Sequence, residues 1–275
     1  MRLPPALLLI ASILALPARA QEPRAAQQGA PTPTPAAAAA VTNVLYVIDG
    51  TGAKAEHRDV LWRLQARLAR EGGDTARYWE GVKDVVRARD AEALYDSVAA
   101  TVCRDVRPRA EGGLGARNVY LAGYSRGAII AVRVANEVRR RCDAHVAFLG
   151  LVDAVNTSIA GWPTAVDSGI PVAVHLVKPR NATAGPLATT HVAGVRELAH
   201  PDRGNRITGW GAIDHTRLVC PVGHERDADG RQATWTESTL LDALRAAADS
   251  AGAPMQFTDT LAASCPPGLK KFFHR

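Results

Sequence analysis

The chain has 275 residues, and 47% of them are hydrophobic, which is enough for one sizeable core or at most two small ones. The formal net charge is +6, but the arginines are scattered apart from a cluster at 139–141, and no aromatic residues alternate with them. This pattern excludes nucleic acid from the expected partners and allows only weak contact with an anionic membrane or cell envelope.

The first 42 residues are expected to lie outside the folded domain. Arg2, an apolar run at 6–16 and small residues up to Ala20 predict a signal peptide, 1–20, that is cleaved after Ala20. Residues 21–42 are rich in Ala and Pro and predict a disordered linker. We therefore expect an exported protein, periplasmic or secreted, whose net charge falls to +4 when the two signal-peptide arginines are removed. No later apolar run is long enough to span a membrane as a helix.

Two hydrophobic patterns alternate along residues 43–275. Continuous apolar runs predict strands at 43–49, 76–82, 117–123, 145–155 and 170–178, and more weakly at 206–213. Apolar residues at helical spacing predict helices at 60–68, 90–106, 127–141 and 236–248. Buried strands that alternate with helices are typical of α/β proteins. We therefore expect one domain, 43–275, built on a mostly parallel sheet with helices on both faces.

Four cysteines follow the export signal, at positions 103, 142, 220 and 265. An even number of cysteines in an oxidising compartment favours two disulfides, although the sequence leaves the pairing open. Cys103 and Cys142 end the two helical segments that flank the strand 117–123, so we favour Cys103–Cys142 and Cys220–Cys265.

The stretch "LAGYSRGA" (121–128) places Ser125 between two glycines, after a predicted strand and before a predicted helix. This is the pattern of a nucleophile elbow, and its alternative interpretation is a strand-to-helix turn without chemistry. In an elbow the backbone N–H of Arg126 is one oxyanion donor. The loop after the first strand offers the N–H groups of Gly50 and Thr51 as the second.

A serine nucleophile of this kind needs an acid and then a base later in the chain. Asp153 ends the next strand and is the preferred acid, with Asp167 as the runner-up. The preferred base is His215, which follows the weak strand 206–213, and the alternative base is His224. His191 and His200 lie in a segment with less strand character.

Two other interpretations of these residues are weaker. His215, Cys220 and His224 lack a common zinc-site spacing, and "GTGAK" (50–54) lacks the full phosphate-loop pattern. No cofactor or metal is therefore expected.

Four motifs together resemble one group of α/β-hydrolases, the bacterial family that includes phospholipase effectors of type VI secretion. They are "IDGTG" (48–52), "YWEGV" (78–82), "GYSRGA" (123–128) and "LGLVDAV" (149–155). The resemblance implies an α/β-hydrolase-like sheet, with Ser125 as nucleophile, Asp153 as acid and the loop 49–51 shaping the oxyanion site. This chain differs from the effectors in its export signal and has no room for their large lid and membrane-binding additions.

These patterns predict an exported serine hydrolase that cleaves carboxylic esters, of the esterase or lipase type. The alternatives are a phospholipase or acyltransferase of the same fold, or a non-catalytic binding module. The expected partner is a small-molecule or lipid ester, and the protein is expected to be a monomer. The segment 178–206 is polar and predicts a mobile loop over the site that favours short acyl chains, whereas "LKKFFHR" (269–275) is the part suited to an anionic membrane.

Overall fold

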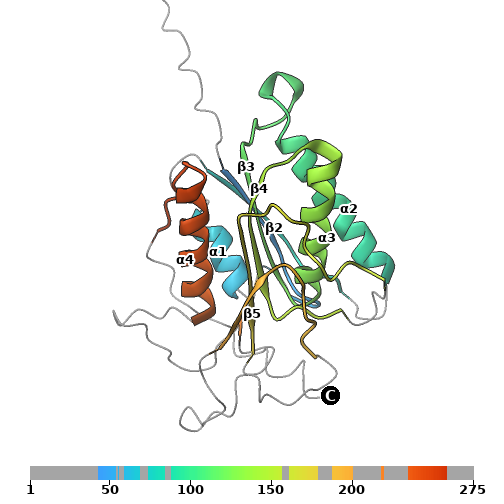
Figure 1. Cartoon of the computed structure of the whole chain (residues 1–275). Helices are drawn as coiled ribbons and strands as arrows, with labels where there is room; N and C mark the ends of the chain where they lie inside the picture. The colour runs from blue at the N-terminus through green and yellow to red at the C-terminus, as the bar shows by residue number, and fades with distance from the viewer. Residues whose placement is uncertain are drawn as a thin grey trace, which may run out of the picture. The chain divides into compact units, whose positions relative to one another are not determined.

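The strands of the structure form one parallel sheet in the order β2-β1-β3-β4-β5-β6 (Figure 1). The computed structural model describes residues 43–53, 55, 59–68, 74–83, 88–156, 161–178, 188–200, 218–219 and 235–258. These residues all belong to one compact unit, Ala39–Arg275. The strands are β1 (Asn43–Ile48), β2 (Thr75–Trp79), β3 (Asn118–Tyr124), β4 (Val146–Val152), β5 (Val172–Val177) and β6 (Arg196–Ala199).

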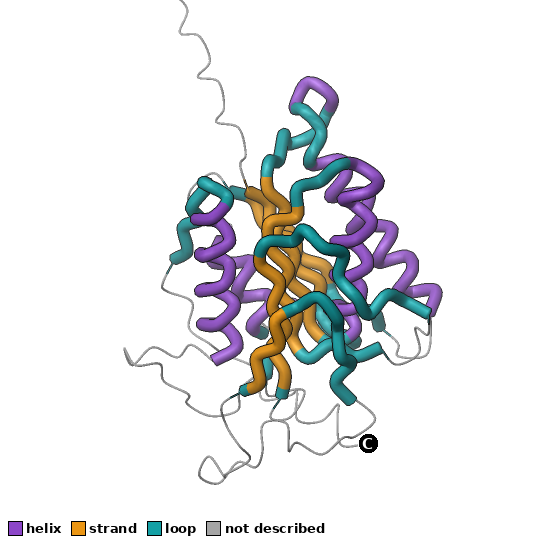
Figure 2. The backbone as a smooth tube through the Cα atoms, viewed as in Figure 1, coloured by secondary structure: helices purple, strands orange, loops and turns teal. Residues whose placement is uncertain are grey.

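Helices cover both faces of this sheet. They are α1 (Val60–Leu68), α2 (Ala88–Asp105), α3 (Arg126–Cys142) and α4 (Trp235–Ser250), with a short 3-10 helix, η2, at Arg109–Glu111. In Figures 1 and 2, α2 and α3 lie on one side of the sheet and α1 and α4 on the other. The predicted α/β class, a parallel sheet with helices on both faces, is confirmed.

Alternate residues of the central strands supply the two core layers. In β1, Tyr46 and Ile48 pack with α2 and α3, whereas Leu45 and Val47 pack with α1 and α4. Because both faces of the strand are buried, its sequence after Asn43 is a continuous apolar run rather than an alternating one. This is why the central strands were predictable.

One strand was not predicted. β6 (Arg196–Ala199) lies within the segment 178–206, which the sequence analysis interprets as a polar loop, so that interpretation is wrong for these four residues. β6 pairs with β5 on one side and is mostly exposed. Since an edge strand of this kind needs no apolar run, its sequence "RELA" gives no hydrophobic signal. The predicted signal peptide 1–20, the linker 21–42 and the weak strand 206–213 lie outside the described residues.

The predicted Cys103–Cys142 disulfide is confirmed, and it joins α2 to α3. The second predicted bridge, Cys220–Cys265, lies outside the described residues. The covalent link fixes the far end of α3, the helix whose first residue follows Ser125.

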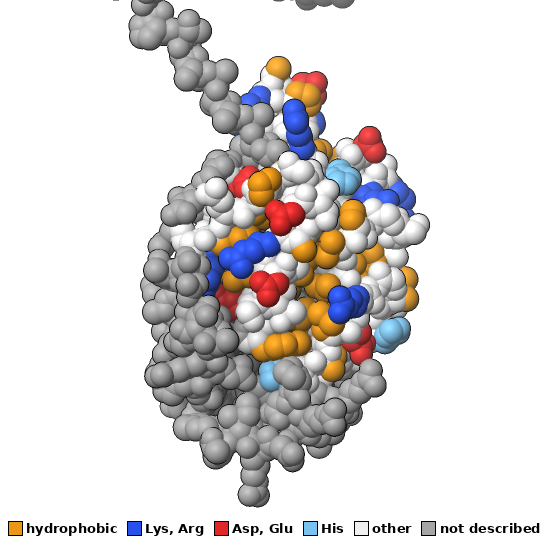
Figure 3. Space-filling model, turned by 60° about the vertical axis from the view of Figure 1, so that its left-hand side comes forward, with side chains coloured by type: hydrophobic (Ala, Val, Ile, Leu, Met, Phe, Trp, Pro, Cys, Tyr) orange, Lys and Arg blue, Asp and Glu red, His pale blue; other side chains and the backbone are white. Residues whose placement is uncertain are grey.

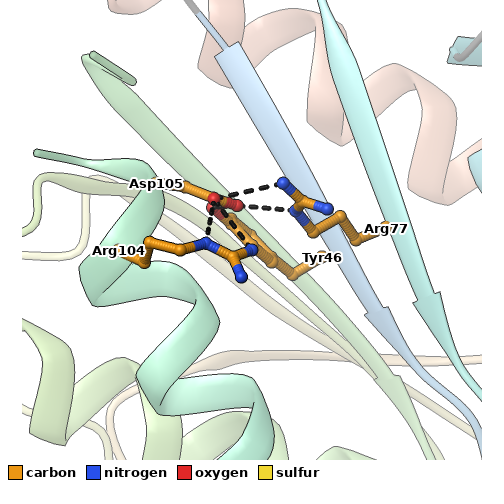
Figure 4. Close-up of polar contacts among 4 residues, drawn as sticks. All are labelled: Tyr46, Arg77, Arg104 and Asp105. Atoms are coloured by element: carbon orange, nitrogen blue, oxygen red, sulfur yellow. Dashed lines mark hydrogen bonds and ion pairs between the residues drawn. The ribbon is translucent and has the colours of Figure 1, made fainter. Parts of the chain in front are cut away.

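A buried carboxylate holds the end of α2 against the sheet (Figure 4). Asp105 accepts hydrogen bonds from the Tyr46 hydroxyl at 3.1 Å, from Arg77 Nε at 2.6 Å and from Arg104 Nε at 3.2 Å. α2 ends before β3 begins, so this cluster lies toward the amino ends of the strands. It therefore belongs to the framework on the opposite side from the strand ends that carry the predicted site.

The described surface mixes charges of both signs. On the face of Figure 3, acidic, basic and hydrophobic side chains are interspersed rather than gathered into one charged field. None of the described helices is long and apolar enough to cross a membrane.

The order in which strands are added to the sheet reverses between β1 and β3. β2 lies on one side of β1, and all later strands lie on the other side. α1 follows β1 and covers one face, and α3 follows β3 and covers the other. In open α/β sheets, ligands bind outside the carboxyl ends of the strands at such a switch point. The predicted Asp49–Thr51 loop and Ser125 follow these two strands directly.

Candidate active site

Ser125 occupies the turn between β3 and α3 in a backbone conformation that L residues rarely adopt, with φ 55° and ψ −121°. Its N–H donates to the Val152 carbonyl at 2.9 Å, and its own carbonyl accepts from the N–H groups of Ala128 and Val155 at 3.2 and 3.1 Å. The surrounding structure therefore holds the strained turn in place from both β4 and α3. Strain of this kind concentrates at functional sites.

The two flanking glycines are required by close packing. A Cβ at Gly123 would lie 2.5 Å from the Gly127 carbonyl oxygen, and a Cβ at Gly127 would lie 2.3 Å from the Ile48 carbonyl oxygen. Only glycine allows β3, α3 and the end of β1 to approach this closely. Since α3 begins at Arg126, the Arg126 amide is among the first N–H groups of the helix, which have no acceptor within it.

The loop after β1 lies against the elbow. A Cβ at Gly50 would meet Tyr124 at 2.6 Å and the Ser125 Cβ at 3.0 Å. The Gly50 N–H, one of the two predicted oxyanion donors of this loop, donates to Asp49 Oδ1 at 2.7 Å. The Gly50 amide is therefore already engaged, and the Thr51 amide is the better candidate for the second oxyanion donor.

Asp153 lies beside Ser125 because β3 and β4 are neighbours in register. Tyr124, the last residue of β3, pairs with Val152, the last residue of β4. Ser125 and Asp153 are therefore the first residues beyond two neighbouring strands that are about 5 Å apart. The Asp153 side chain is completely buried, and its φ is 38°. The structure thus brings the predicted nucleophile and the predicted acid to the same edge of the sheet.

Partners of the Asp153 carboxylate come from two later segments. The Thr189 hydroxyl donates to Oδ1, and Lys178 Nζ lies 3.8 Å from Oδ2. The next residue, Thr190, also contacts the chain around Asp153, because its N–H donates to the Ala154 carbonyl at 2.6 Å. None of these three residues was predicted as part of the site, because the sequence around Thr189 and Thr190 is polar and Lys178 only ends a predicted strand.

His175 is a further residue that the sequence analysis missed. It lies within β5 and is completely buried, and its Nε2 accepts the Ala154 N–H at 3.0 Å. Burial lowers its pKa to about 4, so the ring is neutral at pH 7 and accepts this hydrogen bond. The sequence does carry a sign of this residue, because a histidine within the apolar run of a predicted strand is a candidate buried polar group.

Two further aspartates are buried near this loop, Asp49 directly after β1 and Asp59 directly before α1. Asp49 Oδ2 accepts the Tyr78 hydroxyl at 2.7 Å, and Asp59 Oδ1 accepts the Trp62 N–H at 3.0 Å. Burial, followed by the charge of Asp59, raises the pKa of Asp49 well above its usual value, and burial raises the pKa of Asp59.

The other candidate residues are elsewhere or outside the described residues. Asp167, the runner-up acid, is 3.3 Å from Arg140, which is 14 residues beyond the start of α3 and so about 21 Å along the helix. His191 is exposed near Glu197. His200 is buried against Trp235, with ring centroids 4.7 Å apart. His215, Cys220 and His224 lie outside the described residues, within which no group of three or more His, Cys, Asp or Glu side chains forms a candidate metal site.

Leu218 and Val219, which follow His215 in the sequence, lie at the start of α1. The Val60 N–H, at the start of α1, donates to the Val219 carbonyl at 3.0 Å. Leu218 and Val219 are both buried in the core layer of α1 and α4.

No protein-family model and no curated protein matches the chain. Among solved structures it resembles an uncharacterized protein from Pseudomonas aeruginosa, with 16% identity and a TM-score of 0.46 over 79% of this chain and 47% of that chain. This chain therefore spans about half the length of that protein.

The chain also resembles RedJ, a thioesterase from the prodiginine biosynthetic pathway in Streptomyces coelicolor. The identity is 14% and the TM-score 0.35, over 63% of this chain and 86% of RedJ. A RedJ structure with a PEG molecule in the active site gives the same identity and TM-score over 59% and 85% of the two chains. Similarities at this level carry no conclusion about activity.

Proposed function

We propose that the protein is an exported serine hydrolase that cleaves carboxylic esters, with Ser125 as nucleophile, Asp153 as acid and His215 as base. The observation that carries the proposal is the strained Ser125 turn, held at the switch point of the sheet with Asp153 beside it. The resemblance of the four sequence motifs to the hydrolase family of the type VI effectors points in the same direction.

The reaction follows from the roles of these groups. Ser125 Oγ attacks the ester carbonyl carbon while the base takes its proton, and the carbonyl oxygen becomes an oxyanion. The Arg126 and Thr51 amides donate to that oxyanion. The intermediate expels the alcohol, which receives the proton from the base. A water molecule then attacks the acyl group on Ser125 by the same steps, which releases the carboxylic acid product and regenerates Ser125. Asp153 orients the base and stabilises its charged form.

Chain connectivity favours His215 over His224 as the base. His215 precedes the anchored Leu218 by three residues, so their Cα atoms are at most about 11 Å apart. His224 follows Val219 by five residues, which allows about 18 Å. The shorter tether gives His215 the smaller maximum distance from Val219, whose carbonyl contacts the start of α1.

The substrate is proposed to be a soluble ester with a short acyl chain, and the location periplasmic or secreted. Thr189 and Thr190 are polar, and their hydroxyl groups hydrogen-bond to the chain around Asp153 rather than offering an apolar face to a lipid surface.

Turnover of aryl esters of increasing acyl length tests the proposal. We expect hydrolysis that is fastest for the shortest chains and is lost in Ser125→Ala. The matched control is Ser168→Ala, which changes a serine of the distant Arg139 contact and should leave turnover unchanged. Binding of these esters without turnover would favour the binding module. A preference for long-chain phospholipid would favour a phospholipase.

A further inference from the structure

The acid turn, residues 153–155, follows β4 and carries the proposed acid Asp153. His175 on β5 contacts this turn, and the reaction described above gives it no role. We propose that His175 is a positioning residue for Asp153, which holds the acid turn in place by accepting the Ala154 N–H on its Nε2 atom. The inference rests on the proposed hydrolase function and adds to it a residue that neither binds substrate nor takes a proton in the reaction.

The acid turn leaves the sheet with all three of its N–H groups paired. The N–H groups of Asp153, Ala154 and Val155 donate to the Leu176 carbonyl at 2.7 Å, to His175 Nε2 at 3.0 Å and to the Ser125 carbonyl at 3.1 Å, respectively. The first and last acceptors are backbone carbonyls, and the middle one is a side chain. The His175 contact is therefore the part of this arrangement that the residue type decides.

The alternation of side chains along β5 explains how His175 reaches the turn. Its neighbours in the strand, Val174 and Leu176, pack in the core layer of α1 and α4. Successive side chains of a strand point to opposite faces, so His175 points to the face that α2 and α3 cover. Ala154 packs in the core layer of that second face. The acid turn therefore lies on the side of β5 where the histidine ring is available as an acceptor.

The hydrogen bond fixes the protonation state of the ring. A backbone N–H can only donate, so the Nε2 atom that it contacts carries a lone pair, and the neutral ring has its proton on Nδ1. Burial favours the same state, because it lowers the pKa of His175 to about 4 against the opposing charges of Asp153 and Glu197. Nδ1 has no hydrogen-bond partner among the described residues, which leaves the Ala154 contact as the polar anchor of the ring there.

The acid turn needs this support because Asp153 has an unusual backbone conformation. Its φ of 38° lies in the left-handed region, which a residue with a Cβ adopts at a cost and keeps only where its surroundings hold it. The Ala154 N–H belongs to the peptide group that follows Asp153 directly. Without His175 this N–H, in a completely buried residue, would lose its acceptor. The peptide group would then turn toward another acceptor and move the Asp153 carboxylate relative to the base.

Steady-state kinetics with phenyl acetate test this role. Gln places its amide oxygen close to the position of the His Nε2 atom, so His175→Gln keeps an acceptor for the Ala154 N–H and should retain most of the wild-type kcat. In His175→Leu, which has no acceptor, kcat should fall about 10- to 100-fold with little change in KM, because Asp153 acts in the chemical step.

The matched control is His145→Leu, which removes a histidine contact with Asn118 at the amino end of β4 and should leave kcat unchanged. Equal kcat values in His175→Gln and His175→Leu, or a loss confined to KM, would overturn the proposal.

A double variant shows whether His175 acts through Asp153. Asp153→Ala removes the acid but leaves the residual turnover that the other catalytic groups support. If His175 serves to position the carboxylate, adding His175→Leu to Asp153→Ala should lower kcat by less than about twofold. Losses that multiply in the double variant would mean that His175 acts independently of Asp153, which contradicts the proposal.

Histidine 15N NMR of the wild-type protein tests the hydrogen bond without an activity measurement. The shifts of the two ring nitrogens distinguish a neutral ring protonated on Nδ1 from one protonated on Nε2 and from a charged ring. At neutral pH we expect the Nδ1–H form for the signal that is lost in His175→Gln. A proton on Nε2, or a charged ring, would refute the inference and leave the proposed function standing. If Ser125→Ala hydrolyses esters as fast as the wild type, the proposed function fails, whatever the NMR spectrum shows.

Discussion

Replacement of Ser125 by glycine should stabilise the protein while abolishing its activity. At φ 55° and ψ −121° a residue with a Cβ is strained, whereas glycine is not. Strain at such positions costs about 1–3 kcal/mol. The greater freedom of glycine in the unfolded chain offsets about 0.5–1 kcal/mol of the relief. We therefore expect the free energy of unfolding to rise by about 1 kcal/mol in Ser125→Gly.

Urea unfolding of the wild type, Ser125→Gly and Ser125→Ala measures this effect. Ser125→Ala removes the same hydroxyl but keeps the Cβ, so it should remain within about 0.5 kcal/mol of the wild type. In thermal unfolding, the glycine variant should gain about 2–4 °C. If Ser125→Gly is less stable than Ser125→Ala, the turn stores no strain and the reasoning is refuted.

Reduction of Cys103–Cys142, which closes a loop with a sequence separation of 39, should lower the free energy of unfolding by about 4 kcal/mol, and denaturant titration with and without reductant measures this. His175 stays neutral in the folded protein down to pH about 4, whereas the unfolded chain takes up its proton below about 6.5. Stability should therefore fall by about 3 kcal/mol as pH drops through this window, and His175→Gln should lose that part of the pH dependence in equilibrium unfolding. His215→Ala should lower kcat for aryl esters nearly as much as Ser125→Ala, whereas His224→Ala should cost far less, and the reverse order would reassign the base.

The most readily predicted elements are those whose burial requires a recognisable pattern of apolar residues in the sequence. β1 is buried on both faces, so its residues after Asn43 form an unbroken run of apolar and aromatic side chains that is typical of a buried strand. In α1, the four residues predicted on one helical face, Val60, Leu61, Leu64 and Leu68, are all completely buried. β6 has no such pattern, because it lies at the sheet edge with most of its side chains exposed.

The candidate site was predictable as far as it depends on local chain geometry. Ser125 and Asp153 each follow a recognisable strand, and the register of β3 and β4 then places them side by side. The partners of Asp153 were not predictable, because Thr189 lies 36 residues further along the chain in a polar segment. The contact of the Gly50 amide with Asp49 depends on a side-chain orientation that residue type alone does not determine.

The most direct test of the central claim is covalent labelling with a fluorophosphonate, followed by mass-spectrometric mapping of the modified peptide. An activated serine at the elbow predicts a single adduct on Ser125, and no adduct in Ser125→Ala. The adduct should form much more slowly in His215→Ala. An unmodified wild-type protein, or an adduct on a residue other than Ser125, would contradict the claim that Ser125 is the nucleophile.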